Sequence, residues 1–126
     1  TYWNMFTDYK ININSQNFSD TLSKYTFTLC VNGGGLDPSP KAFEAIIAGS
    51  IPIIKYSSGI YSAYKDLPVV FINDWSADEI NYEKLQTWVS QYRKYYENLE
   101  LRRETLYKLT FEYWKKHIVN YYNDHI

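Results

Sequence analysis

Residues 25–54, which read YTFTLCVNGGGLDPSPKAFEAIIAGSIPII, decide the fold of this chain. The stretch opens with an aromatic and β-branched run, Tyr25 to Val31, that is typical of a strand. A loop must follow from Asn32 to Pro40, because three consecutive glycines cost too much backbone entropy inside a helix or a strand.

The second half of the stretch predicts a helix and another strand. Ser39 is a suitable N-cap, and Pro40 suits the first helical position because the N–H that it lacks would have no partner there. Lys41 to Ala48 continues the helix and Gly49 ends it. Ile51 to Ile54 has the wholly apolar pattern of a strand that is buried on both faces. Strand, loop, helix and strand together predict a βαβ unit with parallel strands.

The rest of the chain extends this pattern. A helical turn is expected around Ile60 to Tyr64, and a third buried strand over Pro68 to Ile72. Ser76 and Glu79 have the spacing of a capping box, so a helical turn can begin there. Two amphipathic helices joined near Asn98 are then expected to close the chain.

These elements predict an α/β fold, a Rossmann-like parallel sheet with flanking helices, formed by residues 1–126 as a single domain. Apolar residues make up 45% of the chain and charged residues 21%, which is the profile of a globular protein. Net charge is only -1, which disfavours nucleic acid and anionic membrane surfaces as partners. The sequence has no apolar stretch long enough to cross a membrane. The single cysteine, Cys30, is expected to be a small core residue.

The glycine loop and the helix start after it are the first candidate binding site. A helix N-terminus presents unpaired N–H groups and the positive end of the helix dipole, which suits a phosphate or diphosphate. Ligands of open parallel sheets bind at the carboxyl ends of the strands, where this loop must lie. Lys41 opposes the dipole, and a bound anion would compensate for its charge. A plain tight turn and a solvated lysine are the alternative interpretations.

Further candidates lie along the helix and after the second strand. Glu44 has apolar neighbours in sequence, so it is expected to need a partner, either Lys41 or a hydroxyl pair of a sugar or ribose. Tyr56 and Ser57 reach the same edge of the sheet and could contact a base, ribose or sugar, although loop polarity explains them equally well. The complete predicted substrate-binding set is Asn32, Gly33, Gly34, Gly35, Asp37, Ser39, Lys41, Glu44, Tyr56 and Ser57.

No metal site is predicted. His117 and His125 have no cysteine or carboxylate cluster with ligand spacing around them.

Several blocks occur in the order and spacing found in one enzyme family. The most specific block is Phe43 to Ile54, FEAIIAGSIPII. With the blocks around it, the chain from about Ser15 to Trp114 resembles the C-terminal lobe of exostosin-like glycosyltransferases. The other blocks are Ser23 to Leu29, Asn32 to Asp37, Lys41 to Ala45, Asp66 to Val70, Asp74-Trp75 and Tyr113-Trp114.

The resemblance implies a GT-B architecture, with two Rossmann-like lobes and a nucleotide sugar held mainly by the second. This chain would be that half-domain, ending in two amphipathic helices and belonging to a longer enzyme. The resemblance also implies that Glu44 binds donor hydroxyls and that the basic residue before it meets the diphosphate. That residue is usually an arginine in the family, often after a histidine, whereas this chain has Pro40-Lys41. A lysine keeps the charge but lacks the bidentate fork.

The expected function is therefore donor binding in a glycosyltransferase that transfers a sugar to an acceptor hydroxyl. The donor would be a UDP- or GDP-linked sugar, and the acceptor a glycan, a glycopeptide or another hydroxyl compound; no cofactor is expected. Lys41 and backbone N–H groups would stabilise the leaving diphosphate without an obligatory metal. The catalytic base is expected from the missing N-terminal lobe, so this chain alone is expected to be inactive.

Three alternatives are weighed against this function. A fucosyltransferase-like or other GT-B family would keep the fold and change the donor. A degenerate lobe would serve only as an interaction domain. A dinucleotide enzyme is disfavoured, because the glycine triplet lacks the G-x-G-x-x-G spacing.

Overall fold

The computed structural model describes residues 23–31 and 41–125. Its sheet has three parallel strands in the order β1-β2-β3. In register, Phe27 lies opposite Ile51, and Ile53 lies opposite Val70. The parallel pairing confirms the predicted α/β class. The strands are β1 (Phe27–Cys30), β2 (Ile51–Lys55) and β3 (Val70–Ile72).

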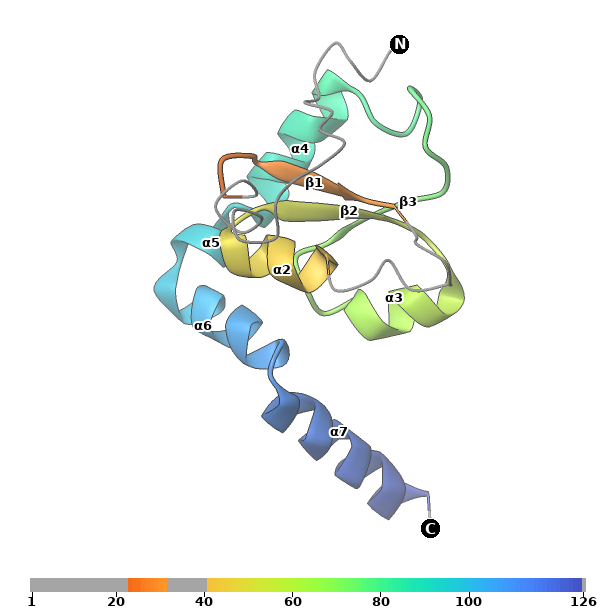
Figure 1. Ribbon diagram of the computed structural model, residues 1–126, viewed down its shortest axis with the longest axis vertical. Coiled ribbons are helices and arrows are strands. Elements are labelled where there is room, and N and C mark those ends of the chain that lie inside the picture. Colours follow the sequence, from red (N-terminus) through yellow and green to blue (C-terminus); the bar gives the residue numbers. More distant parts are fainter. Residues whose placement is uncertain (1–22, 32–40, 126) are drawn as a thin grey trace.

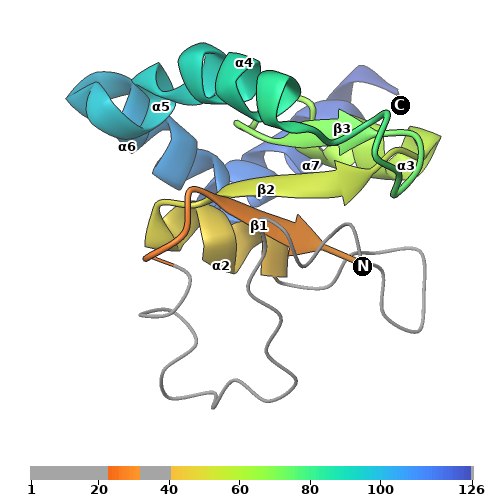
Figure 2. The same cartoon turned by 90° about the horizontal axis from the view of Figure 1, so that it is seen from above.

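Helices cover both faces of this sheet, as Figures 1 and 2 show. On one face lie the two helices that connect the strands, and on the other lie the first two helices after β3. The described helices are α2 (Lys41–Ala48), α3 (Ser58–Tyr64), α4 (Tyr82–Tyr92), α5 (Lys94–Glu97), α6 (Leu99–Lys108) and α7 (Phe111–Asp124). None of them is long and apolar enough to cross a membrane.

The α2–β2 segment folds as its sequence predicts. Gly49 ends α2 with a φ of 93°, a conformation that side chains with a Cβ rarely adopt. The N–H of Ser50 donates to the carbonyl of Ala45 at 2.8 Å, and the Ser50 hydroxyl meets that of Thr28, also at 2.8 Å. The turn is therefore both capped and tied to β1.

One half of the core lies between the sheet and the layer formed by α2 and α3. The Phe43 ring packs edge-on against the Tyr64 ring with centroids 5.5 Å apart, which joins the two helices. The buried members of this first cluster are Cys30, Ala42, Ile46, Ile54, Ile60, Tyr64, Leu67 and Val69.

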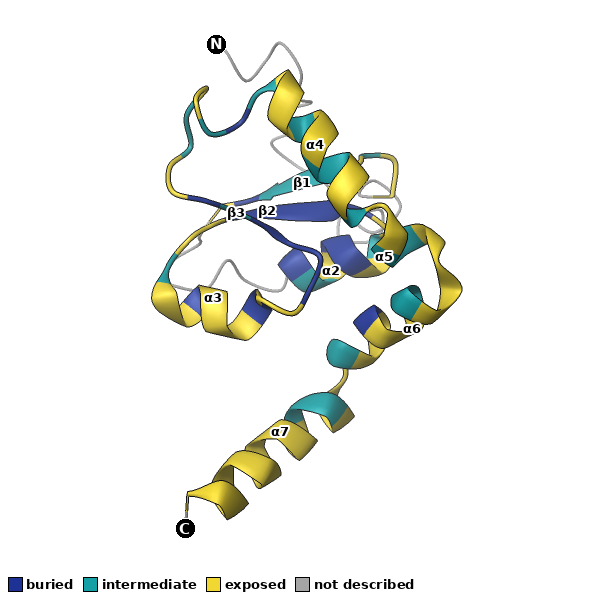
Figure 3. Ribbon diagram, turned by 180° about the vertical axis from the view of Figure 1, so that it is seen from behind, coloured by how far each residue is buried: buried dark blue, intermediate teal, exposed yellow. Residues whose placement is uncertain are grey.

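The other half of the core lies between the sheet and α4–α5. Trp88 packs edge-on against Phe27 at 6.3 Å, and Trp75 also packs against this cluster. Its buried members are Ile51, Ile53, Val70, Ile72 and Ile80. The strand β2 is therefore buried on both faces from Ile51 to Ile54, as predicted (Figure 3).

The turn predicted at Ser76 is present, but it does not continue into a helix. Ser76 forms only a turn, in which its carbonyl accepts from Glu79 and Ile80, and α4 begins six residues later. The reason is the burial of Ile80 in the second cluster, after which Asn81 is extended and caps the helix through Lys84 N at 3.0 Å. The capping box gives a turn because tertiary packing redirects the chain.

The two closing helices predicted around Asn98 are instead four. Asn98 does break the helix, and its side chain caps α6. A second break follows because Leu109 packs against the first cluster, and Thr110 then caps α7 through the N–H of Tyr113. The helix α7 consequently leaves the body of the molecule (Figures 1 and 3).

Side chains of α4 to α6 bind the backbone of the sheet layer. The Tyr92 hydroxyl donates to the carbonyl of Val69 at 3.1 Å, and the Tyr96 hydroxyl donates to that of Ser50 at 3.0 Å. Arg102 donates to the carbonyl of Ile47 at 3.1 Å, at the C-terminal end of α2, where a positive charge is favourable. These bonds attach α4, α5 and α6 to the amino edge of the sheet, where the chain enters β2 and β3.

Replacing Ile53 by Ala is expected to lower the free energy of unfolding by about 2–5 kcal/mol, because Ile53 is fully buried in the central strand. The matched control is Ile47→Ala on α2, where the side chain is 57% exposed and the change should stay within about 0.5 kcal/mol. Urea unfolding followed by circular dichroism measures both. Equal effects at the two positions would contradict the described burial.

Tyr96→Phe is expected to cost about 1 kcal/mol of unfolding free energy, because the buried carbonyl of Ser50 loses its donor. Tyr95→Phe, at the adjacent and also half-buried tyrosine, provides the control and should change stability little. The same urea titration applies. A larger loss at Tyr95 than at Tyr96 would argue against the described hydrogen bond.

Candidate functional site

The carboxyl edge of the sheet gathers the starts of two helices. The strands β1 and β2 end at Cys30 and Lys55, and the helices α2 and α3 begin near the same edge, because each helix runs back to the start of the next strand. Lys41 begins α2, and both Lys41 and Lys55 are exposed. This edge therefore carries positive charge from two separate elements.

Lys41 begins the helix that packs against β1, and its charge acts on the Cys30 thiol. Burial raises the pKa of the Cys30 thiol from its ordinary 9.0 to about 12, and the positive charge of Lys41 partly opposes this rise. The helix α2, which Lys41 begins, packs against β1, and Cys30 is fully buried in that strand. Lys41 thus lies where the sequence analysis expected it, at the carboxyl edge. Cys30 is a core residue, as predicted.

Glu44 is exposed, so the expectation that it needs a partner because it is buried is wrong. The helix turns Ala42, Ala45 and Ile46 toward the core and Glu44 toward solvent. Apolar neighbours in sequence do not imply burial in a helix, since residues three or four apart share a face. By the same spacing, Glu44 lies one turn from Lys41 on the exposed side of α2.

Ser57 and Tyr56 have structural contacts of their own. The Ser57 hydroxyl accepts from the N–H of Ile60 at 3.3 Å and is the N-cap of α3. The Tyr56 ring packs against the rings of Tyr61 at 5.6 Å and Phe71 at 6.5 Å, while remaining 48% exposed. Tyr56, Tyr61 and Phe71 therefore form one aromatic cluster beside the ends of β2 and β3.

The sequence analysis missed Tyr61 and Phe71. Their rings lie 5.3 Å apart, although one belongs to a helix and the other to a strand. No local sequence pattern indicates this contact, because it depends on the pairing of Phe71 with Ile54 and on the position of Tyr61 one turn after the α3 cap. The remaining predicted site residues, Asn32, Gly33, Gly34, Gly35, Asp37 and Ser39, lie outside the described residues.

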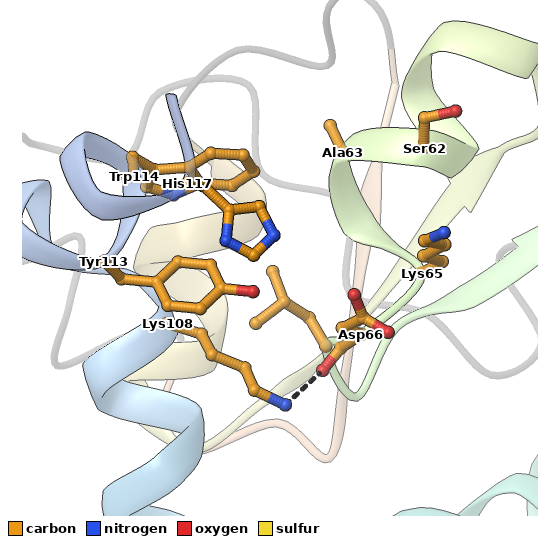
Figure 4. Close-up of a pocket in the computed structure, with 9 residues that line it drawn as sticks. Ser62, Ala63, Lys65, Asp66, Lys108, Tyr113, Trp114 and His117 are labelled. Carbon is orange, nitrogen blue, oxygen red and sulfur yellow. Dashed lines mark hydrogen bonds between the residues drawn. The ribbon is translucent and has the colours of Figure 1, made fainter. Parts of the chain in front are cut away.

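A separate groove of about 210 Å³ lies between the end of α3 and the start of α7 (Figure 4). Lys108 donates to the carbonyl of Asp66 at 3.2 Å across it. The groove is at the amino edge of the sheet, because Asp66 precedes β3. Its lining residues are Ser62, Ala63, Lys65, Asp66, Leu67, Lys108, Tyr113, Trp114 and His117.

Both histidines contact tyrosine rings. His117 lies 4.8 Å from the ring of Tyr113, and His125 stacks on Tyr121 at 4.0 Å. Across residues 23–31 and 41–125, no group of three His, Cys, Asp or Glu side chains is arranged to hold a metal ion.

Comparison with known proteins gave no match. Neither the protein-family models, nor the curated proteins, nor the solved structures contain a counterpart to this chain that reaches significance. Its function is therefore argued from the geometry of the carboxyl edge.

Cys30 is expected to resist alkylation by iodoacetamide in the folded protein and to react readily in urea, because the reactive species is the thiolate. The folded thiol stays protonated as pH rises above 9.0, whereas the unfolded thiol ionises. Its contribution to stability is therefore complete below pH 9.0 and is lost as pH rises toward about 12. Mass spectrometry of this single cysteine measures the reaction. Rapid labelling of the folded chain near neutral pH would contradict the burial.

Proposed function

We propose that this chain is the donor-binding domain of a glycosyltransferase, with the nucleotide sugar at the carboxyl edge of the sheet. The observation that carries the proposal is the position of Lys41, exposed in the first turn of α2, the helix that packs against β1. Open parallel sheets bind their ligands at this edge.

The first turn of α2 suits a diphosphate on electrostatic grounds. The N–H groups at a helix start point away from the helix, and their dipole favours negative charge. A lysine at this position is unfavourable by itself, since it repels the same dipole. A diphosphate would satisfy the N–H groups and Lys41 together, and Lys55 adds a second ammonium group at the same edge.

The sugar part of the donor would use neighbouring groups. Glu44 shares the exposed side of α2 with Lys41, and its carboxylate can accept two hydrogen bonds from adjacent hydroxyls of a sugar or ribose. The aromatic cluster of Tyr56, Tyr61 and Phe71 offers ring faces for a base or a sugar at the same edge. Charge, carboxylate and rings together suit a nucleotide sugar better than inorganic phosphate.

In the proposed reaction, an acceptor hydroxyl oxygen attacks the anomeric carbon of the donor, and the bond from that carbon to the diphosphate breaks. The proton of the hydroxyl passes to a base from a second lobe. Lys41 and the α2 N–H groups stabilise the charge that develops on the leaving diphosphate. The acceptor is a glycan, a glycopeptide or another hydroxyl compound.

The helix α7 is the proposed contact with that second lobe. It has 14 residues and buries none of them, and isolated helices of this length are marginal in water. Large apolar side chains are exposed along it, with Phe111 at 77%. Phe111, Ile118 and Tyr122 recur at spacings of seven and four residues, which places them on one side of the helix.

The same helix favours a second candidate, an interaction domain that has lost donor binding. An exposed apolar helix face is typical of a protein-binding surface. The two candidates differ at Lys41, since only a donor-binding domain requires its charge.

Lys41→Ala is expected to weaken the binding of UDP- or GDP-linked sugars about tenfold or more, because one charge-assisted contact to the diphosphate is lost. Lys41→Arg keeps the charge and should retain most of the affinity. Lys116→Ala, at an exposed lysine on α7, is the matched control and should leave the affinity unchanged. Isothermal titration calorimetry with UDP-glucose, UDP-N-acetylglucosamine, GDP-mannose and GDP-fucose measures all four proteins.

A wild-type chain that binds none of these donors at millimolar concentration would favour the interaction domain. Equal losses of nucleotide-sugar affinity for Lys41→Ala and Lys116→Ala would show that the donor is attracted by the overall charge of the chain and not by a contact with Lys41. Selective binding of the GDP-linked sugars would favour the fucosyltransferase-like alternative.

A further inference from the structure

We propose that the groove between α3 and α7 binds a single pyranose ring of a glycan. This site is separate from the carboxyl edge, because the groove lies where the chain enters β3, at the opposite end of the sheet. The inference rests on the groove alone and does not require the proposed donor binding.

One wall of the groove is aromatic. Tyr113, Trp114 and His117 project from the first turns of α7 toward the end of α3 (Figure 4). The rings pack against one another: the Tyr113 centroid lies 5.6 Å from that of Trp114 and 4.8 Å from that of His117. Tyr113 and Trp114 are only partly buried, so ring surface remains free in the groove. Such surface can pack against the C–H face of a pyranose.

The opposite wall is polar and comes from the end of α3. Lys65 and Asp66 are exposed there, and Ser62 precedes them by one turn. Ammonium, carboxylate and hydroxyl groups together donate and accept hydrogen bonds, as the hydroxyls of a sugar require. The walls are joined by Lys108, whose ammonium donates to the Asp66 carbonyl at 3.2 Å (Figure 4).

The volume of the groove favours a single ring. The groove has a volume of about 210 Å³. Sites for drug-sized ligands measure roughly 300–1,000 Å³, so a whole nucleotide sugar exceeds this one. The lining holds both charges, Lys65 and Lys108 against Asp66, and the hydroxyls of an uncharged ring can hydrogen-bond to ammonium and carboxylate groups alike. The remaining rings of a glycan would extend outside the groove into solvent.

The test uses the indole N–H signals of the four tryptophans in a nitrogen–proton correlation spectrum of the whole chain. The probes are methyl glucoside, methyl galactoside and methyl N-acetylglucosaminide, which carry no nucleotide or phosphate. The Trp114 signal, assigned from its loss in Trp114→Phe, is expected to shift with at least one glycoside at millimolar concentration. The signals of Trp75 and Trp88, which pack in the second cluster, should stay in place.

Trp114→Ala is expected to raise the dissociation constant of that glycoside about tenfold or more, because the stacking surface is lost. Tyr121→Ala removes another exposed ring of α7 that does not line the groove, and it should bind as the wild type does. Asp66→Asn leaves the fold contacts of the backbone intact and should weaken binding through the lost carboxylate. Circular dichroism verifies the helix content of each variant.

Three results would overturn the proposal: an unmoved Trp114 signal with every glycoside, equal losses for Trp114→Ala and Tyr121→Ala, or a Trp114 shift caused by UMP and by no glycoside. Because the probes lack a nucleotide, a shift of Trp114 in a chain that binds no nucleotide sugar supports the groove while the proposed function fails.

Discussion

The burial of β2 on both faces is the constraint on which the rest of the structure depends. Residues 51–54 are covered by α2 and α3 on one side and by α4 and α5 on the other. A strand of this kind must be central and its neighbours parallel, so each connection has to cross the sheet as a helix. The helices that lead into β2 and β3 then start at one edge, and that edge carries both Lys41 and the aromatic cluster.

The sequence was sufficient wherever one local pattern decides the structure. The wholly apolar run of β2, the helix formers of α2 and the glycine at position 49 each leave one plausible conformation, and all three are confirmed. Local spacing failed at Leu109, where burial redirects the chain, and the turn predicted at Ser76 does not continue into a helix because Ile80 is buried. A capping motif contributes about 1 kcal/mol, which the burial of a single large side chain outweighs.

The candidate sites were harder to predict than the fold. The burial expected for Glu44 was wrong, because apolar neighbours along the sequence do not show which face of the helix a residue occupies. The groove is beyond any local pattern, since Lys108 and Asp66 are 42 positions apart and meet only after α6 has packed. The Tyr61–Phe71 contact likewise depends on a helix and a strand that meet across the first cluster. Such sites follow from tertiary contacts, and short-range periodicity carries no information about them.

The central proposal is that a nucleoside diphosphate binds at the carboxyl edge of the sheet, at the start of α2. The most direct measurement is the change in backbone amide chemical shifts on addition of UDP or GDP to the folded chain. The account predicts that the largest changes fall on Lys41, Ala42 and Phe43, with smaller ones at Tyr56. Changes centred instead on Gly49 and Leu67, at the opposite edge, or the absence of any change at saturating nucleotide, would contradict it.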